Sequence, residues 1–541
     1  MTTITETIRQ HAKKTPRKTA FRFLDRNLDA ATEVSYQDFV EQIDTRLQSL
    51  KQIPFGSPVA LVTELSIDFL VTFFSCMEAG LIPTVCHSPR HYFWKSMRNR
   101  LQPILYSSGA VVIFTDTDTE ELKKLTETKA LSWEPLVCDI ASSAMIPPIK
   151  TFPHIERLRD IHASKSIAFL QYTSGSLGSP KGAIITNQNL MHNLEQICHR
   201  TSQDSHSEMF TWLPHSHDMG LVGGIMVPLY AGGTCTILSQ LNFLRNPLNW
   251  WRGMTNWKTT ITAAPSFAYE LCLRELRKEN PTDINLSSLT TAFVGAERIR
   301  PSLLKELTQE SARIGLHMEA IYPSYGLAEC TLMCSGPRKR RATHHTAMFA
   351  EREFVSCGEP IDDLVINNAN GILSIEGPSV FLGYWSQPLL ELRDGPFSTG
   401  DLCELRDGEI YPIGRSDSAF SVNGVKHHAE DFEDSIRLIS RDRSIDLQID
   451  SKIKFAVTHV QTDQQLHVVA LIESQGASKS DELVIAKKLQ AKLSAEHLVP
   501  IEVYFVKKGS LEFTTSGKPR RSEIQKTAEA SMHDRSNSYS N

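Results

Sequence analysis

Residues 172–182 read Tyr-Thr-Ser-Gly-Ser-Leu-Gly-Ser-Pro-Lys-Gly. An apolar run at 167–170 precedes this segment, and a helical pattern can begin at about Asn187. Glycines let backbone amides approach a phosphate closely, hydroxyl side chains donate to its oxygens, and Lys181 supplies positive charge. The pattern therefore predicts a strand, a phosphate-binding loop and a helix. The candidate phosphate contacts are Thr173, Ser174, Gly175, Ser176, Gly178 and Lys181.

The loop differs from a Walker A loop, in which the lysine is followed by the Ser or Thr that holds magnesium. Here Gly182 follows Lys181, and Pro180 precedes it. We therefore expect the main magnesium ligand to come from another part of the chain.

On both sides of the loop, segments of helical period alternate with short apolar runs. This alternation is typical of an α/β fold with largely parallel sheets. The expected helices span residues 36–50 and 66–79, and the expected strands span 59–63, 111–114, 167–171, 234–238, 260–263 and 291–294. After about Gly358, short strands and frequent glycines indicate a small β-rich subdomain that ends near residue 414. We predict a large domain over 1–414, made of two α/β subdomains and the β-rich subdomain at about 358–414. A smaller, mobile α+β domain is expected over 415–541.

Length and composition limit the function classes. A chain of 541 residues is too long for one core and suggests three or four units. The net charge of -5 gives no overall reason to expect nucleic-acid binding. The basic segment 338–345 reads as an exposed loop or as a docking patch for an acidic partner.

Cysteine usage and hydropathy both predict a cytoplasmic protein. The ten cysteines include no Cys-x-x-Cys pair and are expected to be reduced, with Cys330 and Cys334 in the core. The N-terminus, residues 1–22, has no apolar centre typical of a secretory signal. The most apolar stretch, 67–85, contains two carboxylates and a proline, so we expect a buried helix and strand and no membrane span.

Five further motifs follow the loop in order. They read Trp-Leu-Pro-His-Ser-His-Asp-Met-Gly-Leu-Val-Gly-Gly at 212–224, Phe-Val-Gly-Ala-Glu-Arg at 293–298, Ile-Tyr-Pro-Ser-Tyr-Gly-Leu-Ala-Glu at 321–329, Phe-Ser-Thr-Gly-Asp at 397–401 and Gly-Arg-Ser-Asp-Ser-Ala-Phe-Ser-Val-Asn-Gly at 414–424. A sixth, Thr-Thr-Ser-Gly-Lys-Pro-Arg-Arg, spans 514–521. With the phosphate loop, these motifs resemble those of the adenylate-forming superfamily, and are closest to fatty acyl-AMP ligases. The resemblance runs from about Ser35 to Lys518.

The resemblance implies ATP and Mg²⁺ as cofactors and assigns roles to particular residues. Lys518 would be the catalytic lysine, His217 would line the site between carboxylate and ATP, and Glu329 would hold magnesium together with Thr173. The implied nucleotide contacts are Gly295, Ala296, Glu297, Tyr325, Gly326, Asp401 and Arg415. Asp417 would be the hinge, and Ser418 departs from the acidic residue frequent in the family. A buried, structural role for His217 stays open, whereas a metal pair with His215 lacks an obvious third ligand nearby.

The implied activity is ATP-dependent adenylation of a fatty acid, followed by transfer to the phosphopantetheine of an acyl carrier protein or of a synthetase carrier domain. The His-Asp-Met-Gly-Leu stretch, the Gly-Ala-Glu turn and the segment 354–360 favour this branch. Transfer to coenzyme A is the alternative, because the stretch 329–356 is short for the insertion typical of fatty acyl-AMP ligases. A non-catalytic adenylate-binding protein is a third alternative. The resemblance also implies that Gly220, Gly223 and Gly224 leave room for an acyl chain.

Overall fold

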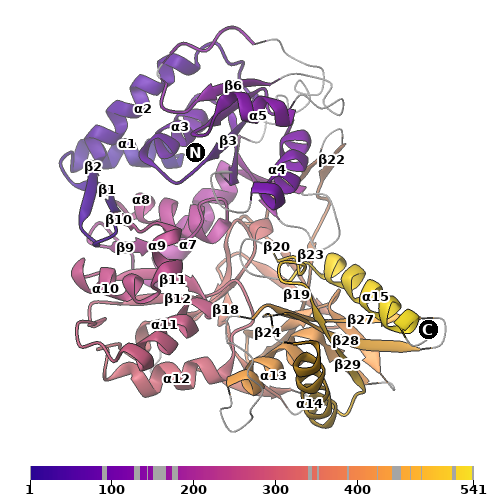
Figure 1. The fold of residues 1–541 in the computed structure, drawn as a ribbon. Helices are drawn as coiled ribbons and strands as arrows, with labels where there is room; N and C mark the ends of the chain where they lie inside the picture. Colours follow the sequence, from indigo (N-terminus) through magenta and orange to yellow (C-terminus); the bar gives the residue numbers. More distant parts are fainter. Residues whose placement is uncertain are drawn as a thin grey trace.

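The computed structural model of the chain describes residues 2–87, 94–126, 135–142, 144–149, 166–173, 181–338, 344–349, 352–386, 389–422, 425–441, 453–462, 465–474, 476, 478–513 and 519–538. Four of the predicted phosphate contacts, Ser174, Gly175, Ser176 and Gly178, lie outside these residues, as does Lys518. Figure 1 shows a large body that carries the first three quarters of the chain and a smaller body that carries the C-terminal part.

A seven-stranded sheet forms one half of the large body (Figure 1). Its order is β13 (Ile321–Pro323), β12 (Thr291–Gly295), β11 (Ile261–Pro265), β9 (Glu208–Thr211), β10 (Thr234–Ile237), β1 (Thr19–Leu24) and β2 (Ala30–Ser35). Neighbouring strands from β13 to β1 are parallel, and only the edge strand β2 is antiparallel. The strands β10, β11 and β12 are buried at every position, as expected for a parallel sheet covered by helices on both faces.

An eight-stranded sheet forms the other half. Its order is β22 (Leu389–Leu392), β21 (Gly383–Ser386), β8 (Lys181–Thr186), β7 (Ile167–Thr173), β4 (Ile82–His87), β3 (Pro58–Thr63), β5 (Val112–Thr115) and β6 (Leu136–Asp139). The strands from β7 to β6 are parallel, whereas β7, β8, β21 and β22 pair antiparallel. Most strand pairs of the two large sheets are parallel, as predicted, and the end of the second sheet from β7 to β22 is the main exception. The connection 174–180 is too short for the crossover that a parallel pair needs, so β7 and β8 are antiparallel.

Helices surround both sheets. They are α1 (Ile4–Lys14), α2 (Tyr36–Leu50), α3 (Ile67–Glu78), α4 (Trp94–Ser108), α5 (Thr119–Thr126), α7 (Asn187–Thr201), α8 (Val227–Ala231), α9 (Gln240–Arg245), α10 (Leu248–Asn256), α11 (Ser266–Glu279) and α12 (Pro301–Ser311). The predicted helices at 36–50 and 66–79 are confirmed. Helix α2 begins where Ser35 and Asp38 exchange capping hydrogen bonds, and α7 begins where Thr186 accepts from the backbone of Asn189 at 3.1 Å.

Short antiparallel sheets follow the second α/β unit. They comprise β14 (Tyr325–Gly326), β15 (Met333–Gly336) and β18 (Glu359–Pro360), the pair β16 (Thr346–Phe349) and β17 (Arg352–Val355), and the four-stranded β19 (Val365–Ala369), β20 (Ile372–Glu376), β23 (Phe397–Arg406) and β24 (Glu409–Arg415). Strands β14 to β17 precede residue 358, so antiparallel structure begins earlier along the chain than the glycine-rich pattern indicates.

The C-terminal part has hydrophobic cores of its own. The large cluster extends as far as Ile410, and the next clusters begin at Phe420. They join a hairpin, β25 (Ala419–Val422) and β26 (Val425–His428), to the sheet β27 (Phe455–Gln461), β28 (Leu466–Glu473) and β29 (Ile501–Val506) and to α13 (Ala429–Arg441), α14 (Lys479–His497) and α15 (Arg521–Ser538). The boundary at 414/415 stays a prediction, which this separation of cores supports. Among the described helices, none is both long and apolar enough to cross a bilayer.

Candidate active site

Three predicted nucleotide contacts are brought together at the end of the β23–β24 hairpin. The register of that hairpin places Asp401 opposite Arg415. Arg415 donates to Asp401 Oδ1 at 3.0 Å, and the hydroxyl of Tyr325 donates to Asp401 Oδ2 at 2.5 Å. Burial and the neighbouring Asp401 carboxylate hold the pKa of Tyr325 well above its usual value, so the phenol stays a hydrogen-bond donor. Both oxygens of Asp401 are thus held by protein donors.

Asp417, the predicted hinge residue, extends this cluster. Its carboxylate accepts from Arg415 Nε at 3.3 Å. Ser418, next along the chain, donates to the backbone carbonyl of Arg415 at 3.0 Å and to Glu430 Oε2 at 2.9 Å. At position 418, where an acidic residue is frequent in the family, this chain has a serine whose hydroxyl hydrogen-bonds to Glu430 of α13.

The turn after β12 contains the residues predicted to contact adenine. A Cβ on Gly295 would lie 2.7 Å from the carbonyl oxygen of Ser324, so only glycine fits there. Ala296 follows with a φ of 62°, a conformation that side-chain-bearing residues rarely adopt and that often marks functional turns. A Cβ on Gly326 would lie 1.9 Å from the carbonyl oxygen of Leu332. Both glycines are required by close backbone packing, which the sequence pattern alone did not reveal.

Glu297 makes a different contact from its neighbours. Its Oε1 accepts from the backbone N–H of Phe267 at 2.8 Å, at the first turn of α11. A carboxylate at a helix N-terminus stabilises the unpaired amides there. In this structure Glu297 joins the turn to α11, and its assignment to the nucleotide stays a prediction.

The predicted metal ligand Glu329 contacts the second α/β sheet. Its Oε1 accepts from the hydroxyl of Tyr384, in β21, at 2.6 Å. Burial raises the pKa of Glu329, and the negative charges of Asp218 and Asp401 raise it further. A divalent cation would relieve this excess of negative charge, and a carboxylate is the hard oxygen ligand that Mg²⁺ prefers. The residues present therefore fit the ion.

Within the described residues, no cluster of three or more His, Cys, Asp or Glu side chains could hold a metal alone. That agrees with an ion held chiefly by one carboxylate and by phosphates of the substrate, as is usual for Mg²⁺. Thr173 ends β7 directly opposite Lys181 of β8, so the two residues flank the loop. Lys181 Nζ lies 3.0 Å from Glu391 Oε2 and 5.2 Å from the centre of the Tyr384 ring.

An apolar pocket that is partly open to solvent adjoins these polar residues, and its cavity volume is about 60 Å³. Its lining comprises Ile197, Asp218, Met219, Gly223, Val227, Ala263, Phe293, Ala296, Ser324, Tyr325, Gly326, Leu332 and Met333. The predicted adenine contacts and a set of aliphatic side chains therefore share one pocket.

Of the three glycines expected to leave room for an acyl chain, Gly223 lines this pocket. Residues 219–226 form a single π-helix, in which Gly220 and Gly224 face other parts of the protein and not the pocket. A Cβ on Gly220 would lie 2.1 Å from the carbonyl oxygen of Pro214, and one on Gly224 would lie 2.8 Å from Thr211 Oγ1. Gly220 and Gly224 thus allow the π-helix to pack closely, and the expectation is wrong for both.

The two histidines before the π-helix differ in environment. His215 is buried, its Nε2 lies 3.0 Å from the carbonyl oxygen of Thr63, and its ring meets Phe69 edge-on at 4.4 Å. Burial lowers the pKa of His215 to about 4. His217 is half-buried, and its carbonyl accepts from Leu221 at 2.8 Å at the start of the π-helix. The structural histidine is therefore His215, and the role of His217 beside the substrate stays a prediction.

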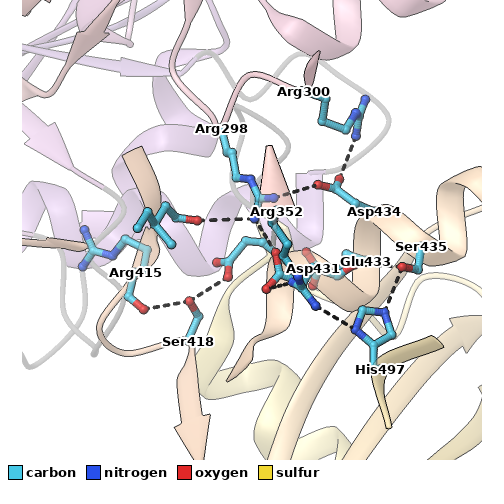
Figure 2. A network of polar contacts seen from close by, with 12 residues as sticks. Arg298, Arg300, Arg352, Arg415, Ser418, Asp431, Glu433, Asp434, Ser435 and His497 are labelled. Carbon is cyan, nitrogen blue, oxygen red and sulfur yellow. Dashed lines mark hydrogen bonds and ion pairs between the residues drawn. The ribbon is translucent and has the colours of Figure 1, made fainter. Parts of the chain in front are cut away.

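An ionic network joins the segment that follows Ala296 to the C-terminal part of the chain (Figure 2). Arg298, next to Glu297, donates to Asp431 of α13 at 2.6 Å, and Arg300 donates to Asp434 at 3.0 Å. Arg352 of β17 also pairs with Asp431 and lies 3.2 Å from His497 Nδ1. Ion pairs thus connect the segment after Ala296 to helix α13 of the C-terminal part.

Three residues beside the site were not assigned from the sequence. Asp218 lies in a quoted motif, where its acidic side chain next to His217 was a usable signal. Tyr384 and Glu391 lie on β21 and β22, far along the chain from the loop. The antiparallel pairing of β21 with β8, which no local pattern predicts, brings them to Lys181.

Comparisons with known proteins agree with this geometry. The family model described as AMP-binding enzyme matches residues 8–385, and the chain belongs to that family. The chain is 29% identical to a medium-chain-fatty-acid–[acyl-carrier-protein] ligase, JamA, of Moorena producens (strain JHB), over 93% of this chain and 91% of the relative. It is 27% identical to a long-chain-fatty-acid–AMP ligase, FadD26, of Mycobacterium marinum (strain ATCC BAA-535 / M), over 95% of both proteins.

The fold matches solved structures over nearly their full length. A structure from a study of fatty acyl-adenylate ligases of E. coli and L. pneumophila superposes with a TM-score of 0.83 at 25% identity, covering 98% of both chains. A structure of McyG A-PCP with phenylalanyl-adenylate gives a TM-score of 0.82 at 20% identity, covering 98% of this chain and 84% of that chain. The second likeness concerns the fold alone.

Proposed function

We propose that the protein activates a fatty acid with ATP as the acyl-adenylate and transfers the acyl group to the phosphopantetheine thiol of an acyl carrier protein. One observation carries the proposal: the pocket that contains Ala296 and Tyr325 continues between aliphatic side chains such as Leu332. The predicted adenine contacts and aliphatic side chains therefore line the same pocket, which is the arrangement that joining a nucleotide to an alkyl chain requires. The names of JamA and FadD26, which refer to fatty acids, support the substrate class.

In the first step, a carboxylate oxygen of the acid forms a bond to the α-phosphorus of ATP, and the bond to pyrophosphate breaks. An anion attacks an anion, so positive charge placed in advance lowers the barrier. We assign this role to Lys518, and we assign orientation of the ribose to Asp401 and Arg415. Mg²⁺, when bound, supplies further positive charge to the triphosphate, and Glu329 with Thr173 would hold it.

In the second step, the thiolate sulfur of the carrier forms a bond to the acyl carbon, and the carbon–oxygen bond to AMP breaks. Asp417, between the two sets of cores, would be the hinge about which residues 415–541 move between the steps. The name of JamA supports a carrier protein as acceptor. The ten unpaired cysteines support a cytoplasmic location for these reactions.

The test is ATP–pyrophosphate exchange measured with a panel of saturated acids. We expect exchange that depends on an added fatty acid; its absence with every acid would leave a non-catalytic binding protein. Active enzyme is then incubated with a pantetheinylated carrier protein or with coenzyme A. Acyl carrier as the product supports the proposal, whereas acyl-CoA alone would assign the protein to the acyl-CoA ligases.

A further inference from the structure

Tyr384 makes a short hydrogen bond to the predicted metal ligand. Its hydroxyl lies 2.6 Å from Glu329 Oε1, within the range of charge-assisted O–H···O⁻ bonds. The phenol donates and the carboxylate accepts, so the bond engages one oxygen of Glu329.

The ring of Tyr384 is fixed by neighbouring aromatic rings. It meets Phe381 edge-on at 4.8 Å between ring centres, and Phe381 meets Phe397 edge-on at 4.9 Å. Edge-on aromatic pairs contribute about 0.5–1.5 kcal/mol beyond the area they bury. The position of the hydroxyl is thus determined by packing, independently of Glu329.

The backbone around Glu329 is fixed to the same segment. Phe381 N–H donates to the carbonyl of Glu329 at 2.8 Å, and Thr331 Oγ1 donates to the carbonyl of Ser379 at 2.8 Å. Thr331 has φ 65° and ψ -57°, the angles of a γ-turn, which a β-branched residue adopts only when its surroundings enforce it. The donor and the acceptor of the Tyr384–Glu329 bond therefore belong to one rigid unit.

The ring of Tyr384 also lies beside Lys181. Lys181 Nζ lies 5.2 Å from the ring centre, within the range of a cation–π contact. Lys181 also pairs with Glu391, but both side chains are about half exposed, so this pair contributes little. One aromatic ring thus contacts the predicted phosphate-binding lysine and the predicted metal ligand.

We infer that Tyr384 is a positioning residue, which holds Oε1 of Glu329 so that Oε2 is presented to the magnesium ion of a bound Mg·ATP. This inference rests on the proposed function. Tyr384 does not touch the reacting atoms; it limits the rotamers of Glu329 and places the ring that carries Lys181. Removing the hydroxyl leaves packing intact and allows the carboxylate to turn away from the ion.

Tyr384→Phe tests this role. A hydrogen bond to a charged group contributes enough that its loss should raise the half-saturating Mg²⁺ concentration about tenfold in ATP–pyrophosphate exchange. A second readout needs no turnover: the Mg²⁺ concentration at which a non-hydrolysable ATP analogue raises the melting temperature should increase by about the same factor. The matched control is Tyr504→Phe, which removes a 2.5 Å bond to Glu502 in the small domain and should change neither value.

A double-mutant cycle with Glu329→Gln separates positioning from general packing. If Tyr384 acts through the Glu329 carboxylate, Tyr384→Phe should add little to the magnesium requirement of Glu329→Gln. An equal shift in both backgrounds, or a folded Tyr384→Phe protein with a normal magnesium requirement, would overturn the inference. Wild-type protein that shows no exchange with any acid would instead count against the proposed function.

Discussion

The two ends of the pocket are built on different principles. At the polar end, side chains from distant segments hold one another through hydrogen bonds, as in Tyr325, Asp401 and Arg415. At the apolar end, the shape depends on an absent side chain, as at Gly223, where a Cβ would lie 3.1 Å from Leu332 Cδ2. The polar end requires particular functional groups, whereas the apolar end requires only volume. We therefore expect mutations at the polar end to change the rate with every acid, and mutations at the apolar end to change which acid is accepted.

The largest effect, equal for every acid, should come from Lys518→Ala, which removes the predicted catalytic charge. A charge pair at about 4 Å and an effective dielectric near 20 contributes roughly 4 kcal/mol. Loss of that charge should lower the exchange rate about 10³-fold for every chain length, while ATP still binds. Lys508→Ala, at an exposed position of the same domain, is the control and should be close to wild type. Near-normal exchange in Lys518→Ala would contradict the assignment.

The stability of the protein should depend on pH through buried His215, which precedes the π-helix that carries Gly223. Its pKa is lowered from 6.5 to about 4 in the folded protein, so the unfolded chain binds the proton more readily. The stability contributed by neutral His215 is present above about pH 6.5 and is lost as pH falls toward 4, up to about 3 kcal/mol.

Denaturant unfolding of wild type and His215→Gln at several pH values measures this effect. Gln cannot titrate and can still donate to Thr63, so the variant should lose less stability than wild type as pH falls from 6.5 to 4. Parallel curves for the two proteins over that range would show that His215 is not the titrating group.

Asp401→Asn tests the residue that is predicted to contact the ribose. The change removes the charge that Arg415 and Tyr325 share, and hydrogen bonds to charged groups contribute about 1.5–3 kcal/mol. We expect the KM for ATP to rise at least tenfold with all acids alike. Asp407→Asn, in the exposed turn of the same hairpin, should leave the KM unchanged. An effect that varied with chain length would assign Asp401 to the apolar end.

The smallest effect, and the most selective, should come from Gly223→Val. A Cβ there would lie 3.1 Å from Leu332 Cδ2, so added methyl groups occupy the pocket. We expect kcat/KM for long acids to fall about tenfold and that for short acids to change little. Gly224→Val places its side chain against Thr211 and should lower the melting temperature without altering chain-length preference. Equal losses for all acids in Gly223→Val would contradict the division between the two ends.

The sequence predicts the features that depend on local motifs, and it does not predict those that depend on packing between distant segments. Helix 36–50 was predictable because its period and its Ser35 cap are local. Tyr325, Asp401 and Arg415 were predictable because motifs carry them, and the structure brings them together. Tyr384 was not predictable, because its place beside Glu329 depends on the pairing of β21 with β8. The direction of Gly220 and Gly224 was not predictable either, since it depends on a π-helix with no distinct sequence period.

A crystal structure with a non-hydrolysable acyl-adenylate analogue, such as an acyl-sulfamoyl adenosine, is the direct measurement of a pocket shared by nucleotide and acid. We predict that the adenine will lie between Ala296 and Tyr325, the ribose on Asp401, and the acyl chain along Gly223 and Leu332. An acyl chain that left the adenylate in another direction, or an adenine bound away from Tyr325, would contradict the account.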